Sequence, residues 1–154
     1  MKAASDIESD QKLNLAWWAL RVGLGLAPIL AGLDKFFNLL TNWEMYLDPT
    51  IPGLLHIQPT AFMHIAGLVE IVAGILVFTP LTRFGSYLVM AWLLAIAVNL
   101  LAQGMFFDIA VRDVELALAA FVLAKLTEAR KNSAIERESG MGVNVATQSA
   151  RHVA

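Results

Sequence analysis

The sequence predicts an all-α protein, a four-helix transmembrane bundle with up-down-up-down topology. Of its 154 residues, 58% are hydrophobic and only 16% are charged, whereas an average soluble domain carries about 25% charged residues. The apolar residues form four long blocks, and most charges lie at the ends of the chain or between the blocks. We therefore expect a lipid bilayer to surround the protein.

The first apolar block, residues 13–40, follows a polar segment of residues 1–12. Because the block is long and three more follow it, we interpret it as a retained helix and not as a cleaved secretory signal. It contains Arg21, Asp34 and Lys35 within its apolar sequence. A spanning helix needs about 20 mostly apolar residues, so the block is long enough to span.

The next two blocks are the clearest spans. Residues 60–79 contain His64 and Glu70 as their titratable groups, and a proline on either side of the block predicts its start and its stop. Residues 84–105 carry no charge at all. Both blocks have the length and apolar character that a spanning helix requires.

The fourth block, residues 109–126, is the weakest candidate. Arg112, Asp113 and Glu115 crowd its start, and such a segment inserts only if the other helices shield its polar end. Residues 127–154 form a polar tail, in which we expect a few further helical turns and then disorder from Ser139 onward.

Positive charges predict the orientation of the bundle. The connection of residues 41–59 has no Lys or Arg. The other connections and the two ends carry Lys2, Lys12, Arg83, Lys125, Arg130, Lys131 and Arg137. By the positive-inside rule, both termini face the cytoplasm, and the protein is a multi-pass protein of the inner (cytoplasmic) membrane.

Charged side chains inside a span are costly and mark candidate functional sites. In the first block, Arg21 and Lys35 share one helical stripe with Gly25 and Gly32. Counted at 1.5 Å per residue, Arg21 lies ~9 Å and Glu70 ~13 Å from the cytoplasmic ends of their spans. We therefore predict an Arg21–Glu70 salt bridge. We favour a structural role for this pair over a role in a proton path.

The outer ends of the four spans bring the remaining polar side chains together. We expect a cofactor-binding pocket of roughly 300 Å³ or more between the first, second and fourth spans. Its candidate residues are Lys35, His64, Asp113 and Glu115. A buried charge network accompanies it, formed by Arg21, Asp34, Glu70, Asn99 and Arg112.

Simpler interpretations of the same residues stay open. Asp34 and Lys35 also suit interfacial positions, with side chains that snorkel from a helix end. Arg112 also has the spacing of ordinary surface ion pairs, three or four residues apart, at the start of a helix. His64 alone is more often a helix-end histidine than a ligand.

Motifs in three of the blocks resemble the DoxX family of small four-helix bacterial membrane proteins. They are Arg21-Val-Gly-Leu-Gly with Ala31-Gly-Leu-Asp34-Lys35-Phe-Phe-Asn38, Gly67-Leu-Val-Glu70-Ile-Val-Ala-Gly74, and Arg112-Asp113-Val-Glu115-Leu. The resemblance covers roughly residues 15–126. The family includes, or lies near, the small subunit of an archaeal thiosulfate:quinone oxidoreductase. The resemblance therefore implies a membrane protein associated with redox enzymes.

Three functions compete at this point. The first is a quinone-linked or accessory subunit of a membrane redox complex, in which apolar aromatic walls flank the outer polar cluster. Those walls would come from Phe36, Phe37, Phe62, Phe106 and Phe107. The second is a non-enzymatic membrane anchor or assembly factor for a partner oxidoreductase. A small-solute transporter ranks last, since the sequence shows no internal repeat.

The composition also limits cofactors and partners. With no cysteine, the chain itself does no thiol chemistry and has no thiolate metal site. We expect a quinone as the candidate cofactor, and neither haem nor a metal ion. The net charge of -2 argues against a nucleic-acid partner. A soluble or membrane oxidoreductase partner and a homo-oligomer remain candidates.

Overall fold

The computed structural model describes the backbone of residues 2–153 and the side chains of residues 11–135 and 139, and this part of the chain contains helices and no strand. The elements in order are α1 (Lys2–Asp34), the 3₁₀ helix η1 (Trp43–Tyr46), α2 (Thr50–Leu55), α3 (Pro59–Phe78), α4 (Thr82–Gln103) and α5 (Phe107–Val153). The all-helical fold class is confirmed.

Three of the described helices are long and apolar enough to cross a membrane, namely residues 11–34 of α1, all of α3 and all of α4. The chain is thus a multi-pass membrane protein. The described part of α5 does not meet the same criterion, because charged residues lie on both sides of its apolar stretch of residues 116–124. Its first turns nevertheless pack closely along α4.

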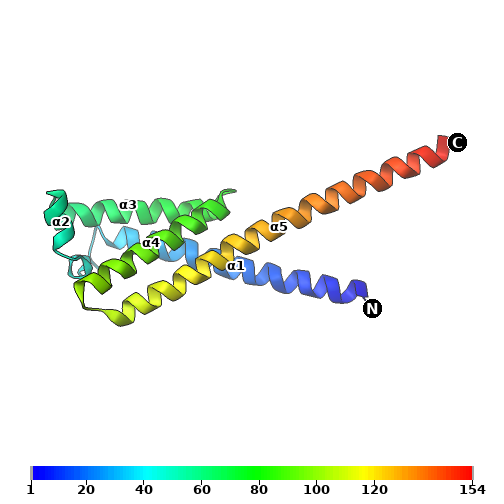
Figure 1. The fold of residues 1–154 in the computed structure, drawn as a ribbon. Helices are drawn as coiled ribbons and strands as arrows, with labels where there is room; N and C mark the ends of the chain where they lie inside the picture. Colours follow the sequence, from blue (N-terminus) through cyan, green and yellow to red (C-terminus); the bar gives the residue numbers. More distant parts are fainter. Residues whose placement is uncertain (1, 154) are drawn as a thin grey trace.

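The molecule has two distinct ends (Figure 1). The loop end carries residues 35–58 with η1 and α2, and also the turn of residues 104–106. The terminal end carries the turn of residues 79–81, and from it the start of α1 and the far part of α5 project away together (Figure 1).

The first helix is shorter at the loop end than the predicted span of residues 13–40. α1 ends at Asp34, whose carboxylate accepts hydrogen bonds from the backbone N–H groups of Leu39 at 3.0 Å and Leu40 at 3.1 Å. Asn38 then adopts a left-handed conformation with φ 50°. The apolar residues from Phe36 to Leu40 therefore form a turn and not a last helical turn, because a side-chain acceptor replaces the helix carbonyls.

The loop and the tail also differ from expectation. Residues 41–59, which were expected only as a connection between spans, contain the short helices η1 and α2. α5 continues as a helix to Val153, beyond the few turns expected after residue 126. The side chains of residues 136–138 and 140–154 lie outside the described part, and disorder of the tail stays a prediction.

Close backbone contact joins α1 to α3. A Cβ on Gly67 would lie 2.6 Å from the carbonyl oxygen of Gly32, and one on Gly74 would lie 2.5 Å from that of Gly25. These distances are too short for any side chain, so the glycine stripe predicted on the first helix faces the glycines of α3. α4 and α5 share a buried cluster of Ala97, Leu100 and Ala110, each at most 2% exposed.

α1 and α5 approach each other chiefly at the terminal end. There the indole Nε1 of Trp17 donates to Thr127 Oγ1 at 2.8 Å, and Arg130 bonds to Asn14. Trp17 and Leu24 also join Ala120 and Leu123 in one buried cluster. α1 is thus held mainly by α3, and α5 by α4, which leaves space between the two pairs toward the loop end.

Candidate functional site

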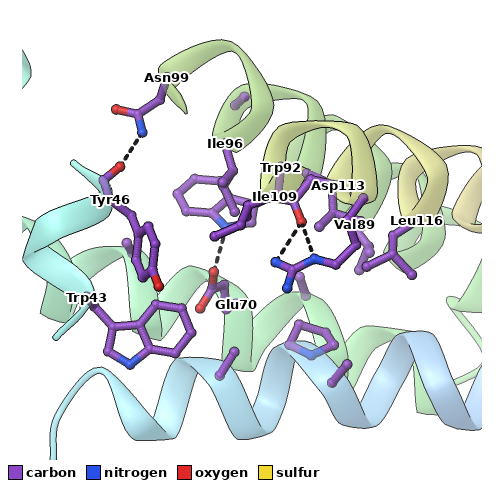
Figure 2. A pocket seen from close by; sticks show the side chains of 18 of the residues that line it. Trp43, Tyr46, Glu70, Val89, Trp92, Ile96, Asn99, Ile109, Asp113 and Leu116 are labelled. Carbon is purple, nitrogen blue, oxygen red and sulfur yellow. Dashed lines mark hydrogen bonds and ion pairs between the residues drawn. The ribbon is translucent and has the colours of Figure 1, made fainter. Parts of the chain in front are cut away.

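A cavity of about 820 Å³ occupies the space among α1, α3, α4, α5 and η1 (Figure 2). Small-molecule sites commonly enclose about 300–1,000 Å³, so the cavity has the size of a ligand site. Most of its lining is aliphatic or aromatic. The residues with polar groups among the lining are Lys35, Thr41, Trp43, Tyr46, Glu70, Trp92, Asn99, Arg112 and Asp113.

A buried ion pair lies on the wall of the cavity. Lys35 Nζ is 2.6 Å from Glu70 Oε2, and the two side chains are only 6% and 5% exposed. The second carboxylate oxygen of Glu70, Oε1, accepts a hydrogen bond from Trp92 Nε1 at 3.1 Å (Figure 2). The negative charge of Glu70 is therefore matched by a cation and by a neutral donor.

The glycine contacts between α1 and α3 explain how this pair forms. Gly32 and Gly67 bring the two backbones together one turn from Lys35 and Glu70. A Cβ on Gly67 would also lie 3.2 Å from the Cβ of Lys35. With so little space between the helices, the lysine side chain reaches the carboxylate of the neighbouring helix directly.

Trp43 of η1 covers the lysine from the loop end. The Lys35 ammonium lies 3.7 Å from the centre of the Trp43 ring, a cation–π contact. The indole Nε1 of Trp43 donates to Asp34 Oδ2 at 2.8 Å. Asp34 therefore organises the turn and positions the tryptophan, and we assign it a structural role.

Two amide side chains of α4 hold the loop from the other side. Asn99 Nδ2 donates to the Tyr46 carbonyl at 2.6 Å (Figure 2), and Asn99 Oδ1 accepts from the Asp48 backbone N–H at 3.0 Å. Gln103 Nε2 donates to the Met45 carbonyl at 3.1 Å. These bonds fasten η1 over the loop end of the cavity.

α5 contributes the second acidic group of the lining. Asp113 is 3% exposed, and its Oδ1 accepts a hydrogen bond from Arg112 Nη2 at 3.1 Å. The Arg112 side chain is itself 62% exposed, so this arginine reaches from the cavity toward the surroundings. The lining thus contains two cations and two carboxylates in an otherwise mainly apolar space.

Only part of the predicted site residues line this cavity. Lys35 and Asp113 do. His64 lies outside the lining and stacks on Phe36 with ring centres 4.8 Å apart, and Glu115 is exposed on α5. Of the predicted network, Glu70, Asn99 and Arg112 belong to the lining, whereas Asp34 and Arg21 do not.

The predicted Arg21–Glu70 salt bridge is wrong. Arg21 donates to the carbonyls of Val77 at 2.9 Å, Phe78 at 2.7 Å and Thr79 at 3.1 Å. The last carbonyls of a helix have no partner within the helix, so the end of α3 offers the guanidinium several acceptors nearer than Glu70. The glutamate lies closer to the loop end and pairs with Lys35 instead.

The expected phenylalanine walls are also largely absent from the site. Phe62 lines the cavity, but Phe37 and Phe107 are exposed, and Phe106 packs edge-on against Tyr46. The aromatic wall consists instead of Trp43, Tyr46 and Trp92 (Figure 2). The sequence held a signal for Trp92, since it shares a helical face with Asn99 seven residues later.

Among the described side chains, no group of three or more His, Asp or Glu could hold a metal ion. That no metal or haem binds remains a prediction. In comparisons with known proteins, the family model described as DoxX matches residues 16–104. The match ends before α5, so Arg112 and Asp113 lie outside it. No curated protein and no solved structure matches the chain.

Proposed function

The chain belongs to the DoxX family, and we propose that it is a four-helix membrane protein whose cavity binds the head group of a quinone. In this proposal it serves as a quinone-linked or accessory subunit of a membrane redox complex. The observation that carries it is the buried Lys35–Glu70 ion pair on the wall of an apolar cavity.

Four crossings account for the arrangement of the helices. The start of α1 and the end of α5 lie at the same end of the molecule (Figure 1), as an even number of crossings requires. In this proposal α5 supplies the fourth crossing, and the support for it is the place of the buried Asp113 in the cavity lining and the packing of α5 on α4. The positive-inside rule then places the terminal end in the cytoplasm and the loop end outside the inner membrane.

The residues of the cavity fit a quinone head group. Its carbonyl oxygens accept hydrogen bonds, and Lys35 and Arg112 can donate them. Its flat ring suits the aromatic wall of Trp43 and Trp92. An ammonium has three N–H donors. Among the described residues, two groups contact Lys35 Nζ, namely the Glu70 carboxylate and the Trp43 ring.

A bound quinone supplies electron and proton transfer between membrane enzymes. The chain's own residues orient it and handle protons. Lys35 would hold one carbonyl oxygen, and Glu70, 2.6 Å from the ammonium, fixes the position of the lysine. Asp113, on the α5 side of the lining, is a carboxylate that can accept or return a proton at the cavity.

An anchoring or assembly role for a partner oxidoreductase is the second candidate. One observation favours it: α5 runs beyond the bundle as a helix to Val153 (Figure 1), a length that the cavity does not need. In that role the buried charges would only specify packing. A network built for packing alone would leave no space, and the cavity of about 820 Å³ therefore favours a ligand.

Extraction of bound lipids tests the proposal. The protein is purified in mild detergent, and quinone is measured per chain after solvent extraction. We expect near-stoichiometric quinone in wild type and in the control Lys125→Met, whose lysine lies at the terminal end. We expect its loss in Lys35→Met, and a reduced amount in Asp113→Asn, which conserves the shape of the side chain.

The same extraction can also rule out the quinone. A wild-type protein that carries no quinone and binds none on addition rules the quinone out. If a soluble or membrane oxidoreductase then co-purifies with it, the anchoring role takes first place. Equal quinone in wild type and both cavity variants would show that the lipid associates elsewhere.

A further inference from the structure

The side of the cavity between α1 and α5 forms a seam to which α1 contributes small residues, Ala19, Gly23 and Ala27. We infer that this seam is a lateral portal through which a tailed quinone enters from the bilayer, and in which its isoprenoid tail stays when the head group is bound. This inference rests on the proposed quinone site and names the form of the ligand, an amphiphile with one long apolar tail.

The α1 side of the portal is open. Ala19, Gly23 and Ala27 line the cavity and are nevertheless exposed. A Cβ on Gly23 would meet no atom within 4 Å, whereas one on Gly32 would lie 2.5 Å from the Gly67 carbonyl oxygen. Gly23 therefore does not serve helix packing, and it leaves room where α1 borders the cavity.

The α5 side shows the same combination of lining and exposure. Leu116 lines the cavity and is 38% exposed, and Ala119 lies one turn further along the same wall. Among the described residues, the hydrogen bonds between α1 and α5 lie at the terminal end, where Trp17 meets Thr127 and Arg130 meets Asn14. The portal thus has a closed terminal end. Its sides are apolar along Gly23 and Leu116, and Arg112 lies on its α5 side toward the loop end.

The loop end of the cavity is covered. Trp43 lies over the Lys35 ammonium and is held by Asp34, while Asn99 fastens the Tyr46 backbone to α4. A ligand from water would have to displace η1, but a ligand in the bilayer meets the exposed small residues of the seam directly. Of these two routes, the lateral one needs no displacement of η1.

The dimensions match a lipid-like orientation. Lys35 and Gly23 are 12 residues apart, which is about 18 Å along a helix. Half of a bilayer's hydrocarbon core is about 15 Å thick. A head group beside Lys35 would therefore lie near the membrane surface at the loop end, and its tail would reach the middle of the bilayer at Gly23.

Two ligands and two matched variants test the portal. A tail-free quinone and a quinone with a long isoprenoid tail are titrated against the protein in nanodiscs, with quenching of tryptophan fluorescence as the readout. Gly23→Phe fills the portal without adding a tryptophan. Leu26→Phe is the control, since Leu26 lies on the same helix, is 46% exposed and does not line the cavity.

We expect Gly23→Phe to weaken binding of the long-tailed quinone at least about tenfold, the loss expected from two buried methylene groups. The tail-free quinone should bind Gly23→Phe as it binds wild type, and Leu26→Phe should bind both ligands normally. If Gly23→Phe affects both quinones equally, or neither, the portal is wrong and the quinone site stands. If wild type binds neither quinone, the proposed function fails and the portal with it.

Discussion

The ion pair between Lys35 and Glu70 gives the sharpest prediction on stability. Its two charged atoms are 2.6 Å apart, and both side chains are almost completely removed from the surroundings. Glu70→Ala removes the carboxylate and leaves the Lys35 ammonium buried with the Trp43 ring as its remaining partner. It also removes the acceptor of the Trp92 indole.

The expected cost follows from these contacts. Removing one partner of a buried ion pair typically costs about 3–5 kcal/mol. For a domain of this size, each kcal/mol lowers the Tm by about 2–4 °C, so Glu70→Ala should lower it by roughly 6–20 °C. Thermal unfolding in detergent, followed by circular dichroism, measures the difference.

Two further variants separate the ion pair from a general effect of lost charge. Glu115→Ala changes an exposed glutamate and should stay within about 0.5 kcal/mol of wild type. The double variant Lys35→Met with Glu70→Leu should be more stable than Glu70→Ala, because no unpaired charge remains buried. The reasoning is refuted if Glu70→Ala melts with wild type, or if the double variant is no more stable than the single one.

Three other predictions concern packing and topology. Arg21→Ala removes the hydrogen bonds to the last carbonyls of α3 and should lower the free energy of unfolding by about 1–3 kcal/mol in the same melting assay. It should leave the quinone content unchanged, and a loss of quinone would contradict the separation of the two ends. Gly67→Ala places a Cβ 2.6 Å from a backbone oxygen and should destabilise the protein by about 1–3 kcal/mol. Gly23→Ala should be neutral or should stabilise the protein by up to about 1 kcal/mol. Equal melting temperatures for the two variants would count against the α1–α3 contact. An alkaline phosphatase fusion should be active at Gly53 and inactive at Arg83 and at the C-terminal end, and activity at the C-terminal end would mean an odd number of spans.

The helix stripes show how far sequence reasoning reached. The 3.6-residue period put Gly25, Gly32 and Lys35 on one face of the first helix, and the structure places that face against α3. A helical period depends only on local geometry, so it can be counted along the chain. The up-down order of the spans predicted that Lys35 and Asp113 meet at the outer end of the bundle, and both line the cavity.

Counting along the chain does not identify the partner of each charged side chain. Arg21 and Lys35 share a stripe, and which of them meets Glu70 depends on the relative height of α1 and α3. That height is set by glycine contacts between the helices and by the turn that Asp34 forms at the end of α1.

The sequence by itself determined that this chain lies in a membrane, because long apolar blocks with few charges are stable only where lipid surrounds them. It also determined which faces of the helices carry the polar groups. Only the tertiary structure decided that Lys35 pairs with Glu70, that Trp43 covers them, and that α1 and α5 stay apart to leave a cavity. These features are distances between helices far apart in the chain, and such distances arise from packing, which no local pattern records.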